Sequence, residues 1–158
     1  GLLVVAKNDR THQSLQAQFK ARSVHKIYQA LVWGSPDPSS GTIEGPIARH
    51  PHHRKRMAIA SGGRNATTDY RTLHAYKEMS LLEVTPKTGR THQIHVHLAS
   101  IGHSIVGDRL YSRAKSDLGR HFLHATTLGF YLPSNEKYVE FFSPLPIGLS
   151  LFIDGLNG

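Results

Sequence analysis

The chain has 158 residues, of which 39% are hydrophobic and 19% charged, and these values suit one globular domain rather than a disordered segment. It contains no cysteine, which excludes disulfides and thiolate zinc sites, and its apolar runs are too short to cross a bilayer, so we expect a cytoplasmic protein without a membrane partner. Nineteen lysines and arginines against eleven acidic residues give a net charge of +8, which favours a polyanionic partner such as nucleic acid.

The beginning of the chain predicts a strand, a helix and a second strand. The uninterrupted apolar run of residues 2–6 predicts a buried strand. In residues 8–22, Leu15 and Phe19 stand four positions apart, which predicts a short helix capped by Asp9 or Thr11. Residues 23–34 return to strand chemistry, and alternation places these side chains on one face: Val24, Lys26, Tyr28, Ala30 and Val32.

The middle of the chain predicts short strands joined by turns. A connector rich in proline, serine and glycine leads to strand chemistry at residues 42–48, a basic run at 49–56 and a short strand at 57–60. Residues 66–76 and 80–87 predict the two arms of a hairpin.

After residue 89 the hydrophobic period becomes helical. Ile94, Leu98 and Ile101 form one stripe of a helix that we expect to run from Thr91 to about Ile101 and to stop at Gly102. Further strands are predicted at residues 122–132 and 137–143, and a docked final helix at 147–158. The predicted class is α+β, a mainly antiparallel mixed sheet with a few packed helices.

The basic run "RHPHHRKR" is a candidate RNA- or DNA-contacting loop. Its cations are Arg49, Arg54, Lys55 and Arg56, and clustered cations of this kind neutralise backbone phosphates. The alternative is a solvated basic loop with no ligand.

The histidine-rich segment at residues 92–103 also raises a metal hypothesis. His92 and His95 are neighbours on the predicted helix, whereas helical geometry turns His97 away from both. No acidic residue occurs between Glu83 and Asp108 to support a metal ligand. We therefore expect no metal, and a histidine-rich metal protein is kept as the third alternative.

The segment "KTGRT" combines Lys87 and Arg90 with a glycine turn just before the predicted helix. Backbone N–H groups and the helix dipole at such a place favour an anion, either a phosphate or a carboxylate. The spacing is not that of a P-loop, and simple helix capping is the alternative.

Taken in order, these segments resemble the RluA-type pseudouridine synthases over essentially the whole chain. "TGRTHQIHVH…GHSIVGD" resembles the family signature T-G-R-T-H-Q-[IL]-R-V-H…G-H-P-I-[LV]-G-D. "GLLVVAK" resembles the end of R-L-D-x-x-T-S-G-L-[LV]-V-x-A-K, and "KIYQALVWG" resembles K-x-Y-x-A-[LR]-V-x-G.

The resemblance implies an enzyme that isomerises uridine to pseudouridine in RNA without a cofactor, on a nucleotide flipped out of its stack. Ribosomal RNA is slightly favoured over transfer RNA as the partner. The family tyrosine that packs against the base corresponds to Tyr28, which shares its strand face with Lys26; a plain core tyrosine is the alternative. Arg90 belongs to the signature and is expected to contact RNA or to brace the active-site loop. His92, in the same signature, is expected to contact RNA.

Two departures from the family pattern concern the catalytic carboxylate. The motif aspartate would lie five residues ahead of Gly1, so we expect residues 1–158 to form a single partial catalytic domain, truncated at its N-terminus and inactive alone. His95 replaces the arginine that usually pairs with this aspartate, and a histidine is only partly charged at neutral pH. Asp108 is expected to fix its own loop. The remaining aspartates are expected to lie in loops or turns: Asp9, Asp37, Asp69, Asp117 and Asp154.

Truncation also predicts an open apolar edge at residues 2–6, with lower stability or association as its consequence. The rival hypothesis is a non-catalytic RNA-binding module derived from the same family. Both readings require Tyr28 and His95 to line one cavity.

Overall fold

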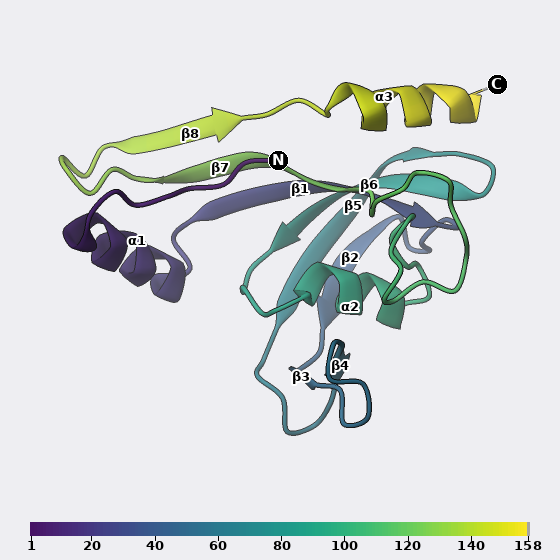
Figure 1. Ribbon diagram of the computed structural model, residues 1–158, viewed down its shortest axis with the longest axis horizontal. Coiled ribbons are helices and arrows are strands. Elements are labelled where there is room, and N and C mark those ends of the chain that lie inside the picture. Colours follow the sequence, from purple (N-terminus) through teal and green to yellow (C-terminus); the bar gives the residue numbers. More distant parts are fainter. Residues whose placement is uncertain (158) are drawn as a thin grey trace.

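The computed structural model describes residues 1–157 and arranges them around one curved sheet with the strand order β2-β5-β6-β1-β7-β8 (Figure 1). The strands span Ser40–Glu44 (β2), Thr67–Ala75 (β5), Met79–Pro86 (β6), His25–Trp33 (β1), Leu123–Tyr131 (β7) and Tyr138–Phe142 (β8). Each of these neighbouring strands pairs antiparallel, and β5 and β6 form the predicted hairpin. The α+β prediction is confirmed.

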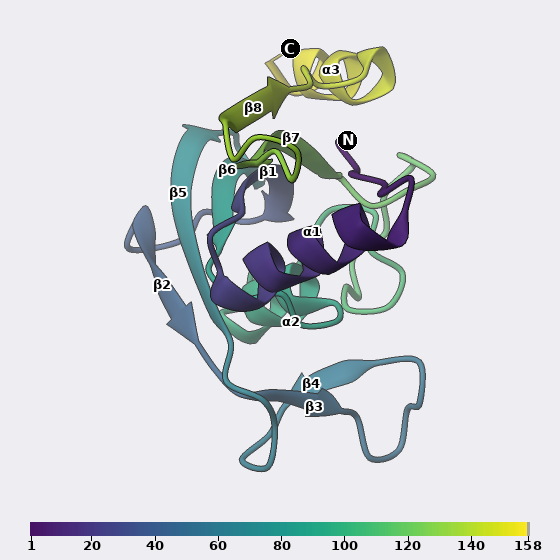
Figure 2. The same ribbon diagram turned by 90° about the vertical axis from the view of Figure 1, so that its left-hand side faces the viewer.

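Within the described residues, three α-helices lie on the two sides of the sheet. They are α1 (Asp9–Ala21), α2 (Gln93–Ser100) and α3 (Ile147–Asp154), the last followed by a 3₁₀ turn, Gly155–Asn157. Figure 1 shows α2 and α3 on opposite sides of the sheet, and α1 lies on the same side as α2 (Figure 2). None of the helices within residues 1–157 combines the length and the apolar character needed to traverse a bilayer.

The helix α2 packs on the sheet through the apolar stripe predicted from the sequence. Ile94 and Leu98 are buried in the same hydrophobic cluster as Leu82 and Val84 of β6. Gly102, with a φ of 85°, follows this helix in the left-handed region that glycine adopts most readily. The predicted helix is therefore confirmed, with its first turn at Gln93 rather than Thr91.

A small second sheet projects from the body. It consists of β3 (Ile47–Arg49) and β4 (Met57–Ile59), and it lies below α2 in both views (Figures 1 and 2). The strand predicted over residues 42–48 is thus wrong as one element, because the chain leaves β2 at Glu44 and enters β3 after Pro46. Proline has no backbone N–H to donate to a continuous ladder.

Two further predictions near the start of the chain are wrong. Residues 2–6 are extended but form no strand, and Leu3 and Val5 are 84% and 74% exposed. Leu2 donates one backbone hydrogen bond to Ala125, and the alternate side chains pack on a small cluster beside β7, so only one face of the run is covered. The cap of α1 is Asn8, whose side chain accepts from the Thr11 N–H, rather than Asp9 or Thr11.

Candidate functional site

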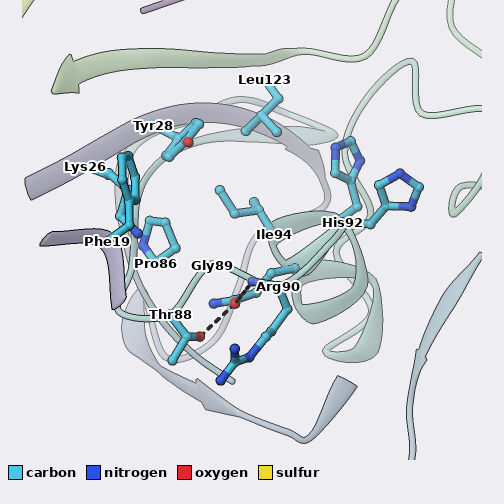
Figure 3. A pocket seen from close by; sticks show the side chains of 12 residues that line it. Phe19, Lys26, Tyr28, Pro86, Thr88, Gly89, Arg90, His92, Ile94 and Leu123 are labelled. Carbon is cyan, nitrogen blue, oxygen red and sulfur yellow. Dashed lines mark hydrogen bonds between the residues drawn. The ribbon is translucent and has the colours of Figure 1, made fainter. Parts of the chain in front are cut away.

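A cavity of about 400 Å³ opens between the middle of the sheet and the segment that leads into α2 (Figure 3). Half of the predicted site residues line it: Lys26, Tyr28, Arg90, His92 and His95. The walls also contain apolar side chains that were not predicted as site residues, chiefly Phe19, Pro86, Ile94 and Leu123. Tyr28 and His95 therefore line one cavity, as both hypotheses required.

The central strand β1 supplies the first two of these residues. Tyr28 pairs with Val84 on one side and with Ala125 on the other, so it sits in the middle of the sheet. Where β1 pairs with β7, the extra residue of a bulge lies on β7. The side chains of β1 therefore keep their regular alternation, and Lys26 and Tyr28 lie on the same face. Burial raises the pKa of the Tyr28 phenol, which therefore stays protonated at neutral pH.

Lys26 lies at the edge of the cavity beside α1. Its ammonium is 5.9 Å from the centre of the Phe19 ring, within the range of a cation–π contact. Burial lowers the pKa of Lys26, because a partly buried ammonium loses hydration. Helix α1 thus contributes an aromatic wall that neither the apolar spacing nor any motif had marked as functional.

The buried side chain of Gln93 holds the loop on the other side of the cavity. Its carbonyl oxygen accepts from the Thr88 hydroxyl at 2.7 Å and from the Arg90 backbone N–H at 3.0 Å. Its amide nitrogen donates to the Thr67 carbonyl and to the Thr68 hydroxyl, both at 2.9 Å. Every polar atom of this glutamine is satisfied, so the loop carrying Arg90 is fixed relative to β5.

We expect Gln93→Leu to lower the free energy of unfolding by about 2 kcal/mol, because leucine leaves buried donors and acceptors without partners. Urea unfolding measures the change. Gln13→Ala, at an exposed position of α1, is the matched control and should stay within about 0.5 kcal/mol of the wild type. Equal stability of the two variants would show that the Gln93 network does not hold the loop.

His92 stands at the corner where this loop enters α2. Its backbone has a φ of 54°, a left-handed conformation that is uncommon for a residue other than glycine. Its Nδ1 lies 2.8 Å from the hydroxyl of Tyr111, which also accepts from the Met57 N–H at 2.8 Å. The Tyr111 hydroxyl therefore links the His92 side chain to the backbone of β4.

His95, predicted to stand nearest a missing acid, has a carboxylate partner within the chain. Its Nδ1 lies 2.8 Å from Oδ2 of Asp108. The other carboxylate oxygen accepts from the backbone N–H groups of Leu110 and Tyr111 at 2.8 and 3.1 Å, which confirms that Asp108 fixes its own loop. Burial alone would raise the pKa of Asp108, but the hydrogen bonds from His95 and the two N–H groups outweigh it and lower that pKa.

His97 points away from His92 and His95, as helical geometry predicted. It is fully buried, with Nδ1 2.9 Å from the Thr68 hydroxyl and Nε2 3.1 Å from the Gly45 carbonyl. Burial lowers its pKa, which favours the neutral ring. Within residues 1–157, no group of three or more histidine or acidic side chains is placed to hold a metal ion.

The remaining predicted residues lie outside the cavity. Lys87 forms an ion pair with Asp69 at 3.0 Å and does not line the cavity beside Arg90. The four cations of the basic run lie on the β3–β4 hairpin: Arg49, Arg54, Lys55 and Arg56. Nδ1 of His50 accepts from the N–H groups of His52 and His53, which shapes the loop between the strands.

Comparison with known proteins gives consistent matches. A family model described as "RNA pseudouridylate synthase" matches residues 1–100. An "Uncharacterized RNA pseudouridine synthase" of Chloroflexus aurantiacus is 49% identical over 159 residues, covering 99% of this chain and 50% of the relative. "Ribosomal large subunit pseudouridine synthase D" of Zymomonas mobilis is 43% identical over 162 residues, covering 96% of this chain and 51% of the relative.

A solved structure is also similar. "Human RNA Pseudouridylate Synthase Domain Containing 1" superposes with a TM-score of 0.75 at 29% identity, covering 96% of this chain and 73% of the human chain. The chain spans about half the length of the curated relatives it matches.

Proposed function

The chain belongs to the RNA pseudouridylate synthase family, and on that premise we propose that its cavity receives a uridine flipped out of an RNA strand. The observation that carries the proposal is the meeting of Tyr28 and His95, from elements far apart in the sequence, in one cavity with Lys26 and Arg90. An extruded base needs a pocket of this size with an aromatic face and a few polar groups.

Each wall has a role in this proposal. The Tyr28 ring offers a stacking face for uracil, and Ile94 and Leu123 offer apolar contacts (Figure 3). Within residues 1–157 no hydrogen bond engages the Tyr28 hydroxyl, so it is free to hydrogen-bond the base and to move a proton late in the reaction. Lys26 and Arg90 supply positive charge at opposite walls for the ribose and phosphates.

The electrostatics beside the cavity support RNA as the partner. Burial and the positive charges of Arg64 and Arg22 lower the pKa of Arg90, so the Arg90 guanidinium lies close enough to each of those two arginines to be repelled by it. Such a cluster is stabilised by a polyanion. We propose that the basic β3–β4 hairpin contacts the same RNA outside the cavity, which predicts that affinity weakens as salt is added.

A carboxylate is the group that the cavity does not contain. Among residues 1–157, none of those that line it is aspartate or glutamate. We propose that the 158-residue chain alone has no turnover and that the nucleophilic aspartate comes from a preceding R-L-D-x-x-T-S-G segment. Ribosomal RNA is the favoured substrate, because two relatives are named ribosomal large subunit pseudouridine synthase D.

The test compares the 158-residue chain with a chain that carries this segment ahead of Gly1. We expect tritium release from RNA labelled at uridine C5 only from the extended chain, and loss of that release when the added aspartate becomes asparagine. Large-subunit ribosomal RNA and transfer RNA transcripts identify the substrate class. Turnover by the 158-residue chain itself would contradict the assignment of the nucleophile.

A second candidate function is an RNA-binding module without catalysis. The hydrogen bond between His95 and Asp108 favours it, because the side chain that replaces the usual arginine is already occupied. If this second function is correct, the extended chain binds RNA with an affinity that weakens as salt is added, as predicted above, but it releases no tritium.

A further inference from the structure

A second cavity lies directly behind the first. It has a volume of about 370 Å³ and shares His92 and His95 with the uridine cavity, so these two imidazoles form a common wall. Its other side is the loop between α2 and β7, which contributes Arg109, Arg120 and His121. No motif in the sequence singled out these three residues.

The charge of this second cavity is positive. Among the described residues that line it, the one carboxylate is that of Asp108, which is only 6% exposed and accepts hydrogen bonds from His95 and from two backbone N–H groups. Arg109 is exposed and forms no ion pair within residues 1–157. An arginine that lines a cavity and has no acidic side chain paired with it among the described residues is suited to bind an anionic ligand.

The loop also presents a second arginine in a fixed position. Arg120 donates from Nε to the His121 carbonyl at 3.2 Å and from one terminal nitrogen to the Leu123 carbonyl at 3.3 Å, which leaves further N–H groups of the fork free. Gly107, with a φ of 76°, packs so closely that a Cβ there would collide with the Arg120 carbonyl oxygen. The two arms of the loop are thus held together, and the arginine is placed before any ligand binds.

We infer that this second cavity binds a phosphodiester group of the RNA next to the flipped uridine, with Arg109 and Arg120 as its ligands. The inference rests on the proposed function, because it takes the base to lie in the first cavity. The ribose of a nucleotide whose base lies in the first cavity carries a phosphate on each side. Because only His92 and His95 separate the two cavities, one of these phosphates would lie near Arg109 and Arg120. Phosphate contacts of this kind fix position without reading sequence.

The test measures binding of the 158-residue chain to a short fluorescent single-stranded RNA that has one uridine among adenosines. Uncharged methylphosphonate linkages replace the phosphodiester on the 5′ side of the uridine, on its 3′ side, or at a remote position. For the wild type we expect one of the two neighbouring replacements to weaken binding about tenfold and the remote one to have little effect.

The arginine variants identify the cavity. Arg109→Ala should bind the unmodified RNA about tenfold more weakly and lose the sensitivity to that linkage, with a salt slope reduced by about 0.7. Arg109→Lys should restore part of both. Arg10→Ala, which removes the same charge from the exposed start of α1, should keep the full wild-type discrimination.

Three results would overturn the inference. In the first, Arg109→Ala still binds the RNA with the neutral neighbouring linkage more weakly than the unmodified RNA. In the second, neither neighbouring replacement weakens binding to the wild type, and in the third the wild type does not bind this RNA. Its failure is distinguishable from failure of the proposed function. Turnover by the extended chain without linkage discrimination removes only the phosphodiester site, and discrimination without turnover removes only the catalytic proposal.

Discussion

Replacing Tyr28 with alanine in the extended, aspartate-bearing chain is expected to lower the rate of pseudouridine formation more than about a hundredfold. The substitution removes the stacking face for the base and the hydroxyl proposed to move a proton, and a positioned acid–base group contributes about a hundredfold or more. Single-turnover tritium release measures the rate, and fluorescence anisotropy measures RNA binding separately.

Two further variants separate the roles of the ring and the hydroxyl. Tyr28→Phe keeps the ring, so we expect nearly unchanged RNA affinity with a strongly reduced rate. Tyr131→Ala, an exposed tyrosine of β7 outside the cavity, is the matched control and should leave both quantities unchanged. A Tyr28→Phe enzyme with the wild-type rate would limit Tyr28 to packing against the base.

Asp108→Ala is expected to lower the free energy of unfolding at neutral pH by about 3 to 5 kcal/mol. The change leaves His95 and the N–H groups of Leu110 and Tyr111 without their acceptor, and each hydrogen bond to a charged acceptor contributes about 1.5 kcal/mol or more. Asp108→Asn keeps an acceptor for the two N–H groups and should lose less. Urea unfolding with both variants measures the difference.

The same carboxylate predicts a direction for the pH dependence. The pKa of Asp108 in the folded protein lies below its ordinary value of 3.8, so the folded state favours the ionised form. Its contribution to stability is therefore present above pH 3.8 and is lost as the pH falls through the lower folded pKa. The stability gap between wild type and Asp108→Asn should shrink in that acid range.

Asp69→Asn provides the surface comparison. Asp69 pairs with Lys87 at a partly exposed position, where an ion pair contributes at most about 1 kcal/mol. The role assigned to the buried contact between His95 and Asp108 would be contradicted if Asp69→Asn lost as much stability as Asp108→Ala. It would also be contradicted if the stability difference between wild type and Asp108→Asn did not change with pH.

The local periodicity of hydrophobic residues was sufficient to predict most of the helices and strands. The apolar stripe of Ile94 and Leu98 and the alternation around Tyr28 each depend on neighbours along the chain, and both were confirmed. Residues 2–6 were predicted wrongly because an unbroken apolar run does not say whether one face or both will be covered. The break at Pro46 was missed because the strand chemistry on either side of it looked continuous.

Residue type and short-range spacing were enough to identify the fold class, the family and the motif residues that line the cavity. Which distant side chains meet became clear only from the packing of the folded chain. It placed Phe19 beside Lys26, gave His95 a partner in Asp108, and turned Lys87 toward Asp69 rather than the cavity. Such contacts depend on how the helices and loops pack on the curved sheet, and no short stretch of sequence carries that information.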